Sequence, residues 1–228
     1  ICDEIRELFM NLNRLYKSVF KSALALTTVL TLSACDNISF GDDDNGTGDS
    51  GTDTPGVLQG DCNAVTTGVN WDALMTENCP NLSDYNLFAD KTDPTVNPNS
   101  SGIPYDLSTA LFTDYASKYR FVFIPEGKTV NYSEHEVLEF PVGSVLVKTF
   151  AMPENTSFRE GNELVIETRL LIRRENGWVA RPYYWENQDD AILAIAGKNI
   201  PDMTTNHNGV DIIFTYSVPK ATSCTSCH

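Results

Sequence analysis

The strictest constraint on the fold is an alternation of apolar and polar residues around Asn176-Gly177. A period of two is typical of a strand with one buried face, and Asn-Gly favours a two-residue type I′ turn. We therefore predict a β-hairpin over residues 163–185. With this turn Leu170 lies opposite Tyr183 and Thr168 opposite Trp185, so the aromatic rings share the apolar face; a turn one residue longer reverses the faces.

The first strand of this hairpin is predicted to have one buried and one solvated face. The buried face holds Leu164, Ile166, Thr168, Leu170 and Ile172, and the solvated face holds Glu163, Glu167, Arg169 and Arg173. We interpret the two glutamates and Arg169 as surface residues and not as a catalytic carboxylate pair with a clamp. The aromatic residues are interpreted as core residues in preference to a sugar-stacking strip: Trp178, Tyr183, Tyr184 and Trp185.

Further strands are predicted on both sides of the hairpin. Residues 119–124 end at Pro125-Glu126-Gly127, residues 144–152 follow Pro141-Val142-Gly143, and residues 211–218 run into Pro219. Residues 108–118 begin with a capping serine and have apolar residues at helical spacing, which predicts a short helix. The predicted fold class is mainly β: an antiparallel sheet or a sandwich in residues 62–220, with a short helix before it.

The N-terminal residues 1–34 have the pattern of an export signal. Three basic residues precede an apolar run over residues 23–32, which is too short for a permanent membrane span. The run ends in Leu32-Ser33-Ala34-Cys35, which resembles a bacterial lipobox and so implies cleavage before Cys35 and a lipid on its thiol. An ordinary signal peptide is the alternative. We expect translation to start at Met10, with a signal helix after it and residues 1–9 upstream.

Residues 35–61 are predicted to be a solvated tether. Residues 36–60 contain six Asp, six Gly and no Lys or Arg, a composition that cannot bury enough apolar surface to fold. A calcium-binding loop is excluded because Thr47 occupies the position of the turn glycine in an EF-hand. The tether would reach roughly 25–30 Å from a membrane. We expect an exported lipoprotein, periplasmic or at the cell surface, anchored at Cys35.

Cys62 and Cys79 are predicted to form a disulfide. They lie in a chain that is expected to be exported, and the other cysteines of the mature chain have different expected uses. A bridge of this span would contribute roughly 3 kcal/mol.

The last five residues, Cys224-Thr225-Ser226-Cys227-His228, match the attachment motif of a c-type haem. The spacing lets both thiols reach adjacent vinyl groups of one porphyrin, while His228 binds the iron as proximal ligand. A structural disulfide is one alternative, and a zinc site completed by Cys62, Cys79 or His207 is another. We expect residues 221–228 to begin a haem domain, and because the chain ends on the ligand histidine, we expect it to be a piece of a longer protein.

The formal net charge of −15 limits the partners. Nucleic acid is excluded as a partner by this charge, whereas a basic redox protein would be attracted. Phosphate-binding glycine loops and nucleophile elbows are absent from the sequence.

Several stretches resemble a family of bacterial diheme c-type cytochromes. They are residues 103–107 (Ile-Pro-Tyr-Asp-Leu), 111–115 (Leu-Phe-Thr-Asp-Tyr), 118–121 (Lys-Tyr-Arg-Phe), 140–148 (Phe-Pro-Val-Gly-Ser-Val-Leu-Val-Lys), 167–174 (Glu-Thr-Arg-Leu-Leu-Ile-Arg-Arg) and Gly177-Trp178. The resemblance covers residues 80–228 and implies a second haem beyond His228.

A weaker likeness concerns the β-fold cytochromes related to cytochrome c-prime-beta. Residues 140–148, the hairpin with Gly177-Trp178 and the late haem motif carry it. This likeness implies a haem lying against the sheet, and it raises the hypothesis that Lys148 is cross-linked to the haem. The alternative for Lys148 is a solvated residue on a strand.

The ligand on the distal side of the iron is left open among four residues. Methionine and histidine are the usual distal ligands of electron-transfer haems. The candidates are Met152, Met203, His135 and His207, each with the alternative of a core methionine or a surface histidine.

Three functions remain open at this point. An exported, lipid-anchored electron carrier is the expected one. The first alternative is a haem enzyme with an open distal site that acts on a small nitrogen or oxygen species. The second is a haem-free β-sandwich that binds a ligand on a lipid tether.

Overall fold

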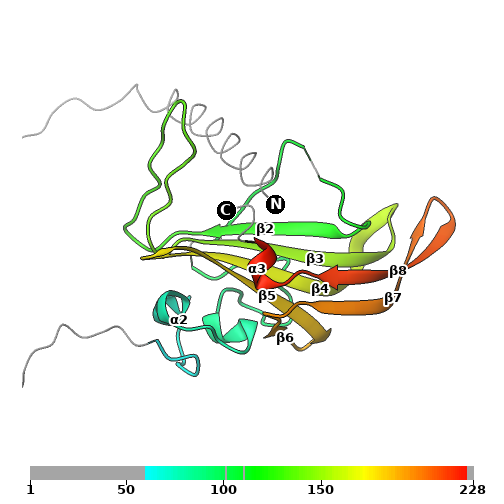
Figure 1. Cartoon of the computed structure of the whole chain (residues 1–228), viewed down its shortest axis with the longest axis horizontal. Coiled ribbons are helices and arrows are strands. Elements are labelled where there is room, and N and C mark those ends of the chain that lie inside the picture. Colours follow the sequence, from blue (N-terminus) through cyan, green and yellow to red (C-terminus); the bar gives the residue numbers. More distant parts are fainter. Residues whose placement is uncertain (1–59, 101, 110, 225–228) are drawn as a thin grey trace, which may run out of the picture.

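The computed structural model describes residues 60–100, 102–109 and 111–224, which form one sheet with short helices against it (Figure 1). The signal, most of the tether and Cys35 lie outside these residues, as do Cys227 and His228. The strands of the described part are β1 (Ile103–Pro104), β2 (Ser117–Phe123), β3 (Val145–Asn155), β4 (Phe158–Arg174), β5 (Gly177–Asn187), β6 (Asp190–Leu193), β7 (Lys198–His207) and β8 (Val210–Val218). The mainly β fold class is confirmed.

The sheet is antiparallel along its main path and branches at one end. Strands β1 to β6 follow one another in sequence order, so each strand pairs with its chain neighbour. The β7–β8 hairpin pairs with β3 in parallel at a single position, Asn155 with Asn206. The sequence predicted either a single antiparallel sheet or a sandwich. The described residues form a single sheet, and the β7–β8 hairpin covers part of it.

The β4–β5 hairpin exists as predicted, but its register differs by two residues. Arg174 pairs with Gly177, so the turn residues are Glu175 and Asn176. Leu170 consequently lies opposite Arg181, and Thr168 lies opposite Tyr183. A period-two pattern is unchanged by a slip of two residues, so polarity alone could not distinguish these registers. The rings of Tyr183 and Trp185 remain on the apolar face, as predicted.

A β-bulge in β4 changes which residues face the core. Glu167 pairs with Phe150 and Val165 pairs with Ala151, which leaves Ile166 as an extra residue in β4. Before the bulge the alternation is inverted, so Val165 is buried and the Leu164 side chain is 50% exposed. The prediction of Leu164 on the buried face was therefore wrong.

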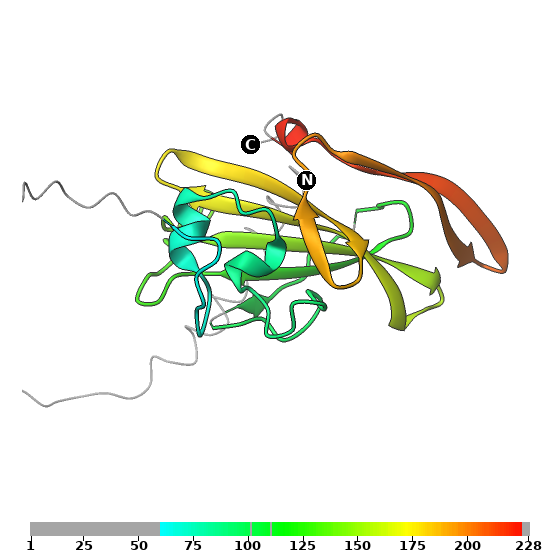
Figure 2. The same cartoon turned by 90° about the horizontal axis from the view of Figure 1, so that it is seen from below.

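The two faces of the sheet are covered differently. We call the side of Val145, Val147, Thr149 and Ala151 the first face, and the side of Leu146, Lys148, Phe150 and Met152 the second face. The segment before β1 lies across the first face (Figure 2) and contains helix α2 (Trp71–Thr76) and the 3₁₀ helix η1 (Leu82–Tyr85). The largest core cluster forms between them and includes Leu74, Tyr85, Phe123, Val147, Leu170, Ile172, Tyr183 and Trp185.

Helix α2 is capped at its start and hydrogen-bonded to the sheet at its end. The Asn70 side chain accepts a hydrogen bond from the Ala73 N–H at 3.3 Å and so caps the start of the helix. At the other end Arg174 of β4 donates to the Leu74 carbonyl at 2.8 Å and to the Glu77 carbonyl. Burial lowers the pKa of the Arg174 guanidinium.

The short helix predicted over residues 108–118 is absent from the described residues of that segment. Asp114 and Tyr115 have φ angles of 45° and 68°, in the left-handed region that interrupts a helix of L-residues. Ser117 already belongs to β2. A short helix does precede the sheet, but it is α2, nearer the N-terminus. Among the described residues, helices long and apolar enough to cross a membrane are lacking.

Candidate functional site

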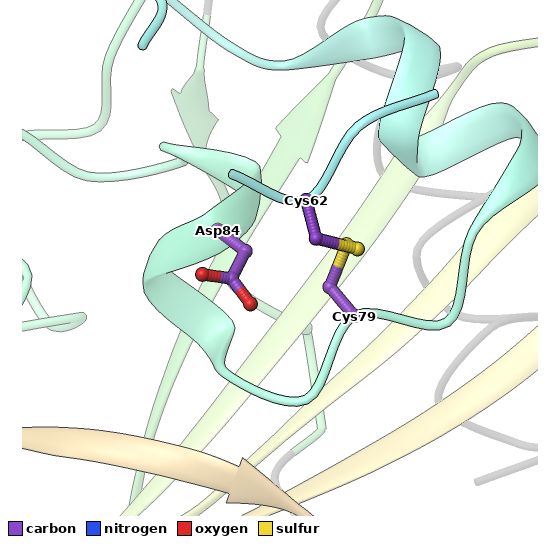
Figure 3. Close-up of side chains that lie close together, drawn as sticks. All are labelled: Cys62, Cys79 and Asp84. Carbon is purple, nitrogen blue, oxygen red and sulfur yellow. A yellow bond between two sulfur atoms is a disulfide. The ribbon is translucent and has the colours of Figure 1, made fainter. Parts of the chain in front are cut away.

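Cys62 and Cys79 are joined by a disulfide under the first face (Figure 3). Cys79 is fully buried, its N–H donates to the Tyr85 hydroxyl at 3.0 Å, and its carbonyl accepts from the Tyr183 hydroxyl at 2.8 Å. The Asp84 carboxylate lies close to both sulfurs, and burial raises its pKa. Because both sulfurs are bonded to each other, this group is not a metal site, and Cys62 and Cys79 cannot complete a zinc site with the C-terminal cysteines.

Replacing both cysteines by alanine is expected to lower the free energy of unfolding by about 3 kcal/mol. The bridge closes a loop of sequence separation 17 and ties the first described residues to the core. Chemical denaturation of the oxidised protein and of the Cys62→Ala/Cys79→Ala variant measures the difference. As a control, a reductant should destabilise the parent protein and leave the variant unaffected; equal stability of parent and variant would contradict the prediction.

The chain leaves β8 for the candidate haem motif through a short helix, α3 (Ala221–Cys224), which packs against β5. The Ala221 N–H donates to the Ile195 carbonyl at 2.9 Å, and the side chain of Ala221 is buried. Gly197 makes this approach possible: its φ is 77°, and a Cβ there would lie 2.7 Å from the Val218 carbonyl oxygen. Helix α3, which ends at Cys224, thereby lies beside β5 (Figure 1).

Three cations form a row across the middle of the second face. Arg120 of β2 pairs with Lys148 of β3, and Lys148 pairs with Arg169 of β4. We call these three residues the cation row. Arg120 is buried, and Lys148 and Arg169 are half-buried. Lys148 is thus partly exposed, with its Nζ 5.0 Å from the centre of the Phe150 ring.

A buried carboxylate holds one end of the cation row. Glu167 is fully buried and accepts two hydrogen bonds from the Arg169 guanidinium, the one from Nη2 at 2.9 Å. The Tyr216 hydroxyl of β8 donates to the same carboxylate at 3.0 Å, and burial raises the pKa of that hydroxyl. Glu167 and Arg169 were predicted to be solvated, which was wrong because the β7–β8 hairpin covers this part of the second face.

An aromatic ring and an exposed carboxylate fix the remaining positions. The Phe150 ring lies 4.5 Å from the Arg169 guanidinium carbon and 5.0 Å from Lys148 Nζ, both of which suit cation–π contacts. Asp106, 95% exposed, lies 3.9 Å from Arg120. Each cation of the row thus has an aromatic ring or a carboxylate beside it.

Apolar clusters flank the cation row, and a cavity opens at its β2 end. One cluster includes Leu138, Phe140 and Leu146; the other includes Phe150, Met152, Met203 and Tyr216. The cavity has a volume of about 770 Å³, and its lining includes Phe112, Tyr115, Lys118, Arg120, Arg159 and His207. This is within the range of pockets that hold small molecules or cofactors.

The four candidates for a distal iron ligand lie in different surroundings. Met152 and Met203 are only 3% and 7% exposed and pack in the same apolar cluster. His207 Nδ1 lies 2.8 Å from the Thr156 hydroxyl, and its ring is 4.9 Å from that of Tyr115. His135 is exposed in the segment between β2 and β3. The structure brings the two methionines together and leaves the histidines apart.

The apolar clusters on either side of the cation row are buried against the β7–β8 hairpin and the segment between β2 and β3, so they do not offer an open surface to a haem. The cation row escaped sequence reasoning because its members are 28 and 21 positions apart, at 120, 148 and 169. Only the register of β2, β3 and β4 places them side by side.

Comparison with known proteins does not narrow the possible functions of this chain. No protein-family model, curated protein or solved structure matches the chain. The function is therefore argued from the motif and from the geometry around it.

Proposed function

We propose that this chain is an exported, lipid-anchored c-type cytochrome that carries electrons. The observation that carries the proposal is the Cys-x-x-Cys-His motif, whose first cysteine is the last residue of a helix docked on the sheet. Cys224 and Cys227 would form the thioethers and His228 would bind the iron. The group supplies one-electron redox chemistry when bound; the chain orients it through α3 and limits its exposure to water.

Two further features support an exported location. The Cys62–Cys79 disulfide is typical of an oxidising compartment outside the cytoplasm. The export signal and Cys35 would place the protein in the periplasm or at the cell surface, with the acidic tether between lipid and sheet. The net charge of −15 favours a basic redox partner and disfavours nucleic acid. Kinship with the diheme cytochromes, with a second haem beyond His228, is part of the same proposal.

Expression together with a cytochrome c maturation system tests the proposal. The protein is expected to show a Soret band and to keep its haem after denaturing electrophoresis, because thioethers survive denaturation. Cys224→Ala with Cys227→Ala should abolish this staining, whereas Cys62→Ala with Cys79→Ala should retain it. An intact mass with haem on two thioethers only would exclude a cross-link to Lys148.

The same experiment distinguishes a haem-free protein. Without a Soret band in matured material, or with unmodified thiols at Cys224 and Cys227, the proposal fails. The chain would then be a tethered β-sheet protein that binds some other ligand.

A second candidate, a haem enzyme with an open distal position, is favoured by one observation. Met152 and Met203 are committed to the apolar core, and His207 already bonds to Thr156. A five-coordinate, high-spin spectrum would support an enzyme that acts on a small nitrogen or oxygen species. A six-coordinate, low-spin spectrum would support the electron carrier.

A further inference from the structure

We infer that two copies of this chain pair through strand β8, edge to edge and antiparallel, to form a two-fold symmetric dimer. This inference is independent of the proposed function, because neither the haem motif nor the export signal enters it. It is carried by the length of the β8 edge, by the direction of its backbone groups and by the distribution of charge along the strand.

The sheet ends at strands β1, β6 and β8, and β8 has by far the longest edge. Strand β1 has two residues and β6 has four, and β6 is also bridged by Asn81 at Ile192. Strand β8 has nine residues and, among the described strands, pairs with β7 alone. Figure 2 shows the β7–β8 hairpin at the margin of the structure. Such an edge presents a row of backbone N–H and C=O groups that can pair with another strand.

The turn of the β7–β8 hairpin fixes which residues of β8 direct their backbone groups outward. Asn208 and Gly209 form a two-residue turn with φ angles of 53° and 82°, as in type I′. The residues that flank such a turn bond to each other, and the direction of the groups then alternates along the strand. Even-numbered residues of β8 therefore bond to β7, and odd-numbered residues direct their N–H and C=O to the free edge. The extra residue of the bulge lies in β7, between Ile200 and Met203, so the alternation along β8 is uninterrupted.

Strand β8 lacks the features with which proteins usually protect an exposed edge. Its sequence, Val-Asp-Ile-Ile-Phe-Thr-Tyr-Ser-Val, contains neither Lys nor Pro. The side chains of Val210 and Ile213 are 64% and 67% exposed. Tyr216 and Val218, in contrast, pack in the apolar cluster of the second face and hold the strand in place. The strand is thus ordered and largely apolar, with its outer edge open to a partner strand.

A second copy fits this edge because β8 is complementary to itself. A two-fold axis perpendicular to the hairpin makes the two strands antiparallel, and an axis at Phe214 pairs all nine residues. The exposed Ile213 then lies opposite the partner's Thr215, a pair of β-branched residues. Asp211 is the single charged residue of β8, and it lies opposite the partner's Ser217. Like charges therefore do not face each other across this interface.

The charge of the whole chain predicts how the dimer depends on salt. A net charge of −15 on each copy opposes association. Salt screens this repulsion and leaves the backbone hydrogen bonds and apolar contacts of paired strands in place. The dimer is therefore expected to become tighter as the ionic strength rises, whereas a dimer held by ion pairs would become weaker.

Sedimentation equilibrium of the full chain in density-matched detergent, over roughly 1–500 µM, tests the pairing. The parent protein is expected to show a reversible equilibrium between monomer and dimer. Ile213→Lys should weaken the dimer at least about tenfold, because a charged side chain on the edge opposes strand pairing. Val137→Lys is the control: it places the same charge at a 55% exposed position between β2 and β3 and should leave the dimer unchanged.

Replacements of Ser217 test the register. Ser217→Lys would place a cation opposite the partner's Asp211, with one such ion pair on each side of the axis. This variant is expected to tighten the dimer about three- to tenfold. Ser217→Asp would place two anions opposite each other and should weaken the dimer by a similar factor. Ser217 is exposed, so circular dichroism should show the parent fold for both variants.

The outcomes decide the inference without involving the haem. A parent chain that stays monomeric at the highest concentration would overturn it, as would equal effects of Ile213→Lys and Val137→Lys. It would also be overturned if both Ser217 variants weakened the dimer equally, because β8 would then not face Asp211 of the partner subunit. The Soret band, which tests the proposed function, is expected to be the same in all of these variants.

Discussion

Glu167→Ala is expected to lower the free energy of unfolding by about 3–5 kcal/mol, which could unfold a protein of ordinary stability. The Glu167 side chain has no exposed surface, and that of Arg169 is only 16% exposed. Removing the carboxylate leaves a guanidinium and the Tyr216 hydroxyl in the interior of the sheet without their acceptor. Most of this loss of stability comes from burying the Arg169 guanidinium without the Glu167 carboxylate, and less of it comes from the lost attraction between the two.

A double replacement separates these two contributions. Glu167→Leu combined with Arg169→Leu removes both charges, so it is expected to be much less destabilising than Glu167→Ala alone. Glu186→Ala, at an exposed position of the adjacent strand, serves as the surface control and should change stability by less than about 0.5 kcal/mol. Urea denaturation monitored by tryptophan fluorescence gives all the values. If Glu167→Ala behaved like Glu186→Ala, the buried pair would not exist in solution.

Leu170→Ala and Leu164→Ala are expected to differ by several kcal/mol although both leucines lie on β4 at even positions. Leu170 is fully buried, so its truncation creates a cavity and should cost about 2–5 kcal/mol. Leu164 is 50% exposed because the bulge at Ile166 inverts the alternation before it. Its truncation should cost less than about 1 kcal/mol.

This pair is a direct test of the bulge. A regular strand would place both leucines in the same core, so the two variants would then be similarly destabilised. Thermal unfolding of both variants under the same conditions decides between the two arrangements. Equal losses would show that β4 has no bulge; a loss confined to Leu170→Ala would agree with the structure.

The sequence predicted those parts of the fold that depend on residues close together in the chain. The strands around Asn176 were predictable because side chains alternate along a single strand, and a hairpin joins neighbouring segments. The helix over residues 108–118 was mispredicted because its spacing says nothing about the left-handed backbone at Asp114 and Tyr115. The register of the hairpin was wrong by two residues because its polarity pattern repeats every two.

The candidate site also has one part that the sequence predicts and one part that it does not. The motif from Cys224 to His228 is contiguous, so its spacing alone predicts its chemistry. The burial of Glu167 depends on a hairpin that is more than 30 residues further along the chain, and no local pattern could indicate it.

By itself, the sequence determined the β4–β5 hairpin, the positions of β2, β3 and β8, and the face that holds Tyr183 and Trp185, because these properties depend on neighbouring residues. Only the tertiary structure decided the bulge at Ile166, the burial of Glu167 and the alignment of Arg120, Lys148 and Arg169. These depend on strand register and on which element covers which face. Both are fixed by contacts between residues far apart in the chain, where the free energy of packing outweighs local preference.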